Sequence, residues 1–186
     1  MRGVIQKREL RDLCNFNVQN LLFGAVALTL LAGCVTPGSA SKPTGTRNPE
    51  VAMASLAALD TLKFSGRWYE VEAFVPDGKS CVIGAVTFTR QTSGDLMVTE
   101  GPCADGAPRQ GLAKRIGPGR FAFEGEEIWV FWVDAEYHVA VMGTPSGAAH
   151  VLSREMNLPP DRQRAVHEIL AWNGYDVTRL RPARRK

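Results

Sequence analysis

The 186-residue chain has little excess of charge of either sign. It contains 22 basic and 19 acidic side chains, and four of the basic and two of the acidic residues fall within its first 34 positions. The remaining chain therefore holds 18 basic and 17 acidic residues, a net charge of +1. Nucleic-acid-binding domains usually carry a clear basic excess. The near balance therefore gives no support to a nucleic-acid-binding function.

The sequence also lacks motifs for hydrolytic and metal chemistry. It has no G-x-S-x-G nucleophile elbow. Its three histidines, His138, His150 and His167, fall on two predicted strands and one predicted helix, without the spacing of zinc or haem ligands. We therefore expect no catalytic residue, no metal and no cofactor.

An apolar run near the N-terminus, Leu21–Leu31, is too short at 11 residues to remain in a bilayer as a spanning helix. A basic segment precedes this run and small residues follow it, which is the layout of a secretory signal. The four residues Leu31–Cys34 resemble the lipobox of bacterial lipoproteins. The resemblance implies that the Cys34 thiol receives a diacylglyceryl group and that its freed amine is acylated. An ordinary secretory signal that contains a cysteine is the alternative.

These boundaries divide the chain into three parts. Residues 1–33 are a predicted lipoprotein signal peptide, residues 34–49 a lipidated tether rich in Thr, Pro, Gly and Ser, and residues 50–186 one folded domain. Val35 stands where lipoproteins retained at the inner membrane often carry aspartate. We therefore expect an outer-membrane lipoprotein that faces the periplasm, if the source has two membranes.

Only two cysteines, Cys81 and Cys103, remain once Cys14 is removed with the leader and Cys34 is acylated. The oxidising compartment of an exported protein favours a disulfide over a metal site. The two cysteines flank a predicted hairpin with its turn at 92–94, which brings them within a residue or two of opposite positions. We predict a Cys81–Cys103 disulfide. Two free buried thiols are the alternative.

Short strands dominate the folded domain. Asn48-Pro49 supplies an N-cap and a proline at the first helical position, which predicts a short helix over residues 49–59. Helical spacing predicts a second helix over 160–173, which Gly174 ends, followed by an extended stretch over 175–180. Apolar runs between turn-forming residues predict eight strands, over 67–74, 81–90, 95–101, 109–116, 120–124, 127–134, 137–143 and 148–154.

Tight turns leave no room for crossover helices, so neighbouring strands pair antiparallel. We predict an all-β fold, an eight-stranded antiparallel up-and-down β-barrel that closes on itself, with the C-terminal α-helix packed on its wall. The chain ends in a basic tail, predicted to be solvated, with contact to anionic headgroups as the alternative. Its basic residues are Arg179, Arg181, Arg184, Arg185 and Lys186.

Three separated motifs make the chain similar to the lipocalins. Gly66 and Trp68 match the G-x-W motif of that family, and Asp134 and Tyr137 match its second motif between the sixth and seventh strands. Arg154, at the end of the eighth strand, matches the third. Up-and-down topology brings all three to one end of the barrel. The resemblance implies that the arginine packs over the tryptophan ring there. Within the family, the likeness is to bacterial outer-membrane lipocalins and apolipoprotein D.

The resemblance implies a barrel that holds one small hydrophobic ligand, a fatty acid or lysophospholipid, without altering it. Topology places Lys79 and Arg109 near the mouth, where they would meet the polar head of the ligand, with surface solvation as the alternative. The sixth strand is apolar on both faces, and periodicity does not decide which face lines the cavity. The predicted lining residues are Val86, Phe88, Val98, Leu112, Phe121, Phe123, Val130, Trp132, Val139 and Val141.

The expected function is therefore that of a membrane-anchored lipid carrier, a monomer or weak dimer whose partners are the ligand and the membrane. Two alternatives belong to other classes. One is a lipid-modifying enzyme on the same scaffold. The other is an interaction module with a filled barrel, because residues 121–132 include five aromatic side chains that can pack the interior.

Overall fold

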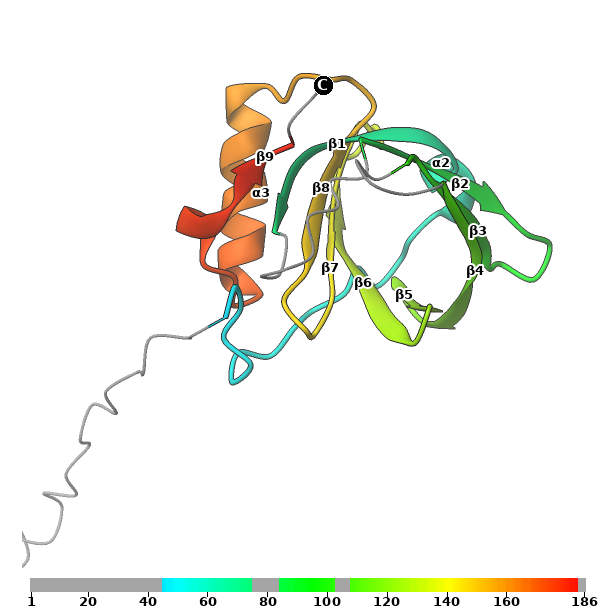
Figure 1. Cartoon of the computed structure of the whole chain (residues 1–186), viewed down its shortest axis with the longest axis horizontal. Helices are drawn as coiled ribbons and strands as arrows, with labels where there is room; N and C mark the ends of the chain where they lie inside the picture. The colour runs from blue at the N-terminus through cyan, green and yellow to red at the C-terminus, as the bar shows by residue number, and fades with distance from the viewer. Residues whose placement is uncertain (1–44, 75–83, 103–107, 184–186) are drawn as a thin grey trace, which may run out of the picture. The chain divides into compact units, whose positions relative to one another are not determined.

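The computed structural model describes residues 45–74, 84–102 and 108–183. Eight strands run up and down and close into a barrel (Figure 1). Each strand pairs antiparallel with the next, and β1 pairs with both β2 and β8, which closes the ring and confirms the predicted fold. The strands are β1 Gly66–Phe74, β2 Ala85–Arg90, β3 Leu96–Glu100, β4 Arg109–Gly117, β5 Arg120–Phe123, β6 Glu126–Val133, β7 Val139–Gly143 and β8 Ala149–Ser153.

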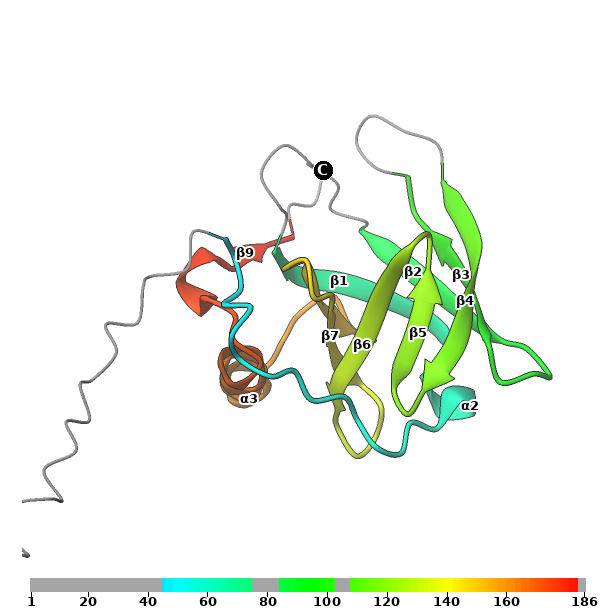
Figure 2. The same ribbon diagram turned by 90° about the horizontal axis from the view of Figure 1, so that it is seen from below.

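Short helical elements lie outside this ring of strands (Figure 2). Helix α2, Thr61–Phe64, precedes β1, and α3, Pro160–Trp172, follows β8. A 3-10 turn, η2 Val177–Arg179, leads to the short strand β9, Arg181–Pro182, which pairs with β1. Among the described residues, no helix has the length and hydrophobicity needed to cross a membrane.

The barrel has two ends with different connections. At the closed end, β1 begins and β8 ends, and α2 lies beside them. At the open end, β1 ends, and the connections β3–β4, β5–β6 and β7–β8 lie there with it. Residues 1–44, 75–83, 103–107 and 184–186 lie outside the described residues.

Two hydrophobic clusters occupy the two faces of the sheet. The interior cluster lines the inside of the barrel, and its buried members are Phe64, Trp68, Val86, Phe88, Leu96, Val98, Ala113, Phe121, Phe123, Val130, Ala140, Met142 and Leu152. The wall cluster lies between the barrel and α3, and its buried members are Phe74, Phe131, Val139, Val141, Ala149, Val151, Val166, Leu170, Tyr175 and Leu180. Because side chains alternate along a strand, one strand can serve both clusters.

A β-bulge in β6 changes which side chains face the interior. Before the bulge, Ile128 and Val130 belong to the interior cluster and Trp129 to the wall cluster. The register shifts between Val130 and Trp132. Beyond it, Trp132 belongs to the wall cluster, and Val133 returns to the interior cluster. A bulge adds one residue to the strand, so simple alternation fails past it.

The helix predicted over residues 49–59 is wrong, because none of these residues is helical in the structure. Its backbone donors are used by distant parts of the chain instead. The Ala54 N–H donates to the Asn173 side chain at 2.8 Å, and the Leu56 N–H donates to the Val130 carbonyl at 2.7 Å. Asn48-Pro49 is a local start signal only. Tertiary hydrogen bonds hold the segment extended along the barrel.

The predicted extended stretch over 175–180 is also wrong in part. Residues Val177–Arg179 form the 3-10 turn η2, which Asp176 caps by accepting from the Thr178 N–H at 3.2 Å. The extended residues come later, in β9, where Arg181 lies opposite Ala73. An aspartate that caps a local turn competes with extended backbone. The predicted helix over 160–173 is confirmed, since α3 ends one residue earlier.

Candidate functional site

Arg154 closes one end of the barrel, as the three-motif resemblance implied. Its guanidinium lies 3.7 Å from the centroid of the Trp68 ring. Its Nη1 donates to the Arg67 carbonyl at 2.7 Å, and its Nη2 donates to the Lys63 and Ser65 carbonyls at 2.9 and 2.8 Å. The Trp68 ring is fully buried. The arginine therefore joins β8 to α2 and β1 and seals the base of the barrel.

Gly66 is required where the arginine approaches the backbone. Its φ of +104° lies in the region that favours glycine, and a Cβ there would lie 3.1 Å from Nη1 of Arg154. The two residues of the second motif lie at the same end of the barrel. Asp134 caps the turn between β6 and β7 by accepting from the Val139 N–H at 2.7 Å. Tyr137 accepts from the Asp60 N–H at 3.0 Å, which joins this turn to α2.

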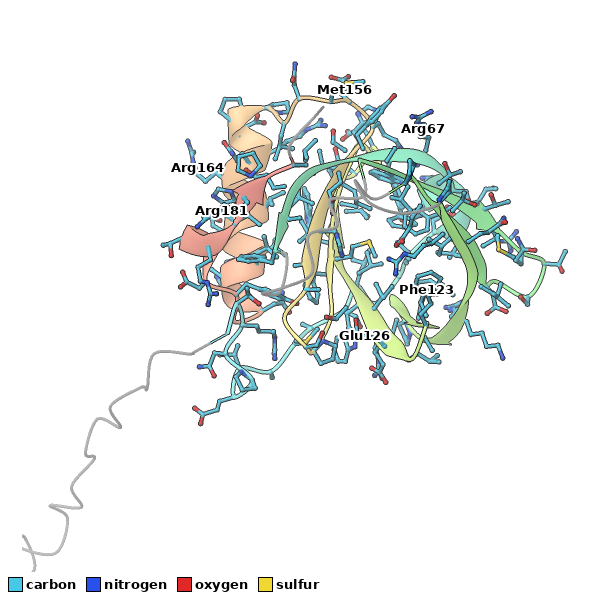
Figure 3. All side chains as sticks on the ribbon, in the orientation of Figure 1. Arg67, Phe123, Glu126, Met156, Arg164 and Arg181 are labelled. Atoms are coloured by element: carbon cyan, nitrogen blue, oxygen red, sulfur yellow. The ribbon has the colours of Figure 1, made fainter. Side chains whose placement is uncertain are left out.

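Six of the ten predicted lining residues face the barrel interior. All six are buried and belong to the interior cluster, and they come from strands β2, β3, β5 and β6. Figure 3 shows Phe123 inside the ring of strands. The six residues are Val86, Phe88, Val98, Phe121, Phe123 and Val130.

The other four predicted lining residues do not face the interior. Leu112 is 39% exposed, because Gly111 and Ala113 take the inward positions of β4. Val139 and Val141 belong to the wall cluster, and their strand turns Ala140 and Met142 inward. Trp132 belongs to the wall cluster because of the β6 bulge. In β4 and β7 the predicted inward residues lie one position along the strand from the observed ones, and a shift of one residue moves a whole set of side chains to the other face.

A group of charged side chains lies on inward positions near the open end. Glu70 on β1 and Glu100 on β3 are both buried. His150 on β8 contacts the Glu70 carboxylate through Nδ1. Arg109 on β4 pairs with Glu100 through Nε at 2.7 Å and with Glu124 at 3.1 Å. We call Glu70, Glu100, Arg109 and His150 the mouth cluster.

The mouth cluster shifts the pKa of the His150 imidazole. Burial by itself lowers the pKa of the imidazole, but the hydrogen bond and charge of Glu70, together with the charge of Glu100, outweigh burial and raise the pKa above its usual value. The Arg109 guanidinium opposes them. The cluster can therefore present either a neutral or a charged imidazole to the barrel interior.

Glu70, Glu100 and His150 were not predicted as site residues. The alternation of side chains along a strand could have placed them inside the barrel, because Glu70 lies two residues beyond Trp68 and Glu100 two residues beyond Val98. His150 likewise lies two residues before the inward Leu152. Arg109 was predicted to meet a ligand head group, and here its side chain, 49% exposed, pairs with acids of this chain. Its contact with a ligand stays a prediction.

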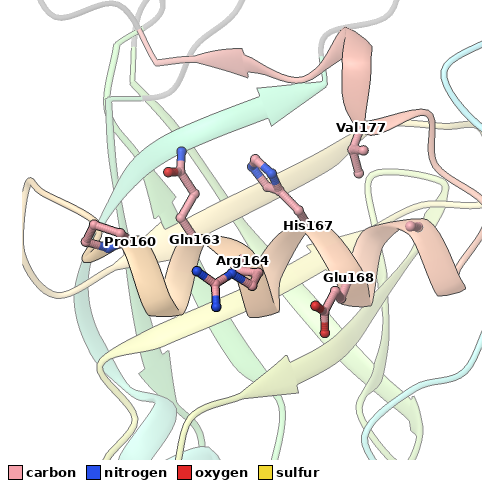
Figure 4. A pocket seen from close by; sticks show the side chains of 7 residues that line it. Pro160, Gln163, Arg164, His167, Glu168 and Val177 are labelled. Carbon is pink, nitrogen blue, oxygen red and sulfur yellow. The ribbon is translucent and has the colours of Figure 1, made fainter.

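Glu72 lies across the bulge of β1 and faces the other way from Glu70. The register shifts between these two residues, and Glu72 accepts from Gln163 at 2.7 Å and contacts His167 at 3.1 Å, both on α3. A hollow of about 420 Å³ lies along this side of α3 and extends to Val177 (Figure 4). A second hollow of about 280 Å³ lies at the closed end beside Arg162.

Several predicted positions lie outside the described residues. These are the acylation site Cys34, the paired Cys81 and Cys103, and Lys79. Among residues 45–74, 84–102 and 108–183, no group of three or more His, Cys, Asp or Glu side chains is arranged to hold a metal ion. The mouth cluster is joined by the ion pair of Arg109 with Glu100 and by the contact of His150 with Glu70.

A closed eight-stranded meander barrel with one wall helix and an arginine stacked on tryptophan at its base defines a class of small-ligand-binding barrels. The chain belongs to the lipocalin family. Residues 59–185 match the family model described as "Lipocalin-like domain". Proteins of this family are in general binding and transport proteins for small hydrophobic molecules.

Individual relatives support the same assignment. The chain is 23% identical over 149 residues to temperature-induced lipocalin-1 of Arabidopsis thaliana, covering 69% of this chain and 80% of that protein. The cockroach allergen Per a 4 has a similar structure, with a TM-score of 0.59 at 14% identity over 74% of this chain and 94% of that one. The bovine lipocalin allergen Bos d 2 also has a similar structure, with a TM-score of 0.56 at 16% identity over 67% of this chain and 95% of that one.

Proposed function

We propose that the protein is a membrane-anchored carrier of a small hydrophobic ligand, a fatty acid or a lysophospholipid, which it does not alter chemically. The observation that carries this proposal is the distribution of polarity inside the barrel. Inward residues at the closed end, such as Trp68 and Phe88, are apolar, and the charged mouth cluster lies toward the open end. Such an interior suits a ligand with a hydrocarbon part and a polar head.

Small inward side chains in the barrel also favour a ligand. Ala113 on β4 and Ala140 on β7 occupy inward positions. Gly111 on β4 leaves no such room, because a Cβ there would lie 2.8 Å from the Phe123 ring, which already fills the space beside it. Transfer of an acyl chain into this interior removes apolar surface from water, worth about 25 cal/mol per Å². Head-group contacts at the mouth would then select among ligands.

A fluorescent fatty acid titrated against the chain from residue 35 onward tests this function. We expect saturable binding that unlabelled fatty acid or lysophospholipid displaces. Ala140→Leu, on the inward face of β7, should weaken binding by at least about tenfold, because its added volume enters the ligand space. Ala149→Leu is the matched control, since Ala149 is equally buried but belongs to the wall cluster.

The outcomes separate the three classes of function. Displaceable binding that Ala140→Leu weakens and Ala149→Leu leaves unchanged supports a carrier. Absence of saturable binding by the folded protein would favour a filled barrel that serves as an interaction module. Release of a hydrolysed probe would favour a lipid-modifying enzyme. Mass spectrometry of an organic extract from natively purified protein would then identify the ligand.

The anchor and the location are a second part of the proposal. The Cys34 lipobox likeness supports acylation, and Val35 after it favours the outer membrane of a source with two membranes, facing the periplasm. Several acyl chains hold a protein on a membrane much more firmly than one does. Incorporation of a fatty-acid analogue, lost in Cys34→Ala, tests this part. A processed chain with an unmodified thiol at position 34 would contradict it.

A further inference from the structure

The chain enters the described domain at the open end of the barrel. Gly45 is the first described residue, and its carbonyl accepts from Nη1 of Arg179 at 2.7 Å. Its neighbour Thr46 donates to the Gly147 carbonyl at 2.6 Å, in the turn between β7 and β8. That turn belongs to the open end. A tether that begins at Cys34 therefore reaches the barrel beside its mouth.

An exposed tryptophan lies next to this entry point. Trp172 ends α3 and is 71% exposed. The residues after it hold the entering chain, because the Asn173 carbonyl accepts from Nε of Arg47 at 2.9 Å. Tryptophan is enriched at membrane–water interfaces, where its ring is half in the apolar region and half in the headgroups. Leu62, on α2 at the closed end, has a similar exposure of 69%.

Positive charge gathers at the same entry point. Arg179 lies against Gly45, and Arg181 on β9 is exposed opposite Ala73 near the end of β1. Figure 3 shows Arg181 on the α3 side of the molecule. Residues 175–186 contain five basic side chains and one acidic side chain. The acidic one, Asp176, caps the η2 turn. We call Trp172, Arg179 and Arg181 the entry face.

We propose that the entry face binds the surface of an anionic bilayer and so turns the mouth of the barrel toward the lipid. This inference rests on the proposed anchor at Cys34. The eleven residue steps from Cys34 to Gly45 span at most about 40 Å, so an acylated Cys34 keeps the entry face within that distance of the headgroups. A ligand would then pass between bilayer and barrel without crossing bulk water.

Fluorescence quenching by brominated lipids tests the orientation in the full acylated chain on vesicles of phosphatidylcholine and phosphatidylglycerol. We expect quenching that Trp172→Phe largely removes, because Trp68 is buried and the other tryptophans are at least partly covered. The control is Leu62→Trp combined with Trp172→Phe, which places an equally exposed ring at the closed end. We expect no recovery of quenching in this variant.

Charge dependence gives a second measurement. Arg181→Gln should lower the docked-to-undocked ratio by about fivefold, since each basic residue near an anionic surface contributes about that factor. Omission of phosphatidylglycerol should lower the ratio at least as much. The matched control, Arg67→Gln, removes one charge near the closed end and should leave quenching unchanged.

Three results would overturn the proposed orientation: quenching of the closed-end tryptophan, equal quenching of both positions, or quenching of neither. The other proposals fail by different measurements. Loss of the carrier function would be recorded by the probe titration in solution, which needs no membrane. Loss of the anchor would be recorded by the mass of the processed chain.

Discussion

Arg154 joins several segments of the chain through a single side chain. One guanidinium stacks on Trp68 and donates to the carbonyls of Lys63 in α2, of Ser65 before β1 and of Arg67 in β1. Only the planar fork of arginine offers this number of donors in a fixed plane. A lysine at this position would keep the charge and lose most of the hydrogen bonds.

We therefore expect Arg154→Lys to lower the free energy of unfolding by about 3 kcal/mol, from several lost hydrogen bonds at about 1 kcal/mol each. Urea denaturation followed by tryptophan fluorescence measures this change. Arg67→Lys is the control, because Arg67 is exposed and lies 5.3 Å over the Tyr69 ring. A change of less than about 0.5 kcal/mol in both variants would show that the sealing role is wrong.

His150 makes the stability of the barrel depend on pH. Its pKa in the folded protein is raised by Glu70 and Glu100 despite burial and Arg109, each of which lowers it. A raised folded pKa stabilises the fold fully below the unfolded value of about 6.5, and this contribution is lost as pH rises through the folded pKa. Glu70→Gln should therefore destabilise the protein most below about pH 6.

The measurement is the free energy of unfolding of wild type and Glu70→Gln across this pH window. We expect a gap on the order of 1 kcal/mol on the acid side that narrows as pH rises. NMR titration of the His150 ring should give a lower pKa in Glu70→Gln. A gap that widens with pH would contradict the proposed direction of the shift.

At the scale of elements, α3 and the barrel share one hydrophobic cluster that is separate from the interior. Val166 and Leu170 on α3 are fully buried against wall-cluster residues of β7 and β8. The bulges in β1 and β6 make this division possible, because they turn Glu72 and Trp132 toward the helix. Helix packing and ligand binding should therefore be separable by mutation.

Leu170→Ala tests this separation. We expect it to lower the free energy of unfolding by about 2 to 5 kcal/mol, the usual cost of a buried cavity, while leaving the affinity for the fatty-acid probe within about twofold. The exposed Glu168→Ala on the same helix is the control and should change neither quantity. A parallel loss of affinity in folded Leu170→Ala would show that the helix supports the ligand site.

At the scale of the whole molecule, the predicted disulfide would follow on from the β2–β3 hairpin, whose described residues end before the two cysteines. The hairpin register pairs Val86 with Glu100, and Gly101 still donates to the Ala85 carbonyl. Cys81 and Cys103 lie beyond these pairs, outside the described residues. The disulfide therefore stays a prediction from the sequence.

Thiol titration of the unfolded, unreduced chain from residue 35 onward measures this bond, and we expect no free thiol. A closed loop of 23 residues should stabilise the fold by roughly 3 kcal/mol in the chain-entropy model. Cys81→Ser and the double variant Cys81→Ser, Cys103→Ser should then be destabilised similarly. Two titratable thiols in the oxidised preparation would exclude the bond.

The amino-acid sequence determined the barrel and its base. Turn residues between short apolar runs specify eight antiparallel strands, because tight connections permit no other pairing. The residues Gly66, Trp68 and Arg154 could be predicted as neighbours because strand order alone brings them to one end. Six of the ten lining residues followed from alternation, which holds wherever a strand is regular.

Only the tertiary structure decided the rest. Local start signals favour a helix over 49–59, but hydrogen bonds to Asn173 and Val130 hold that segment extended. The bulge in β6 directs Trp132 toward the wall cluster. In β7 the alternation of side chains places Ala140 rather than Val141 inside the barrel. The mouth cluster exists because distant strands close on one another. Such choices depend on contacts between residues far apart in the chain, which local patterns do not contain.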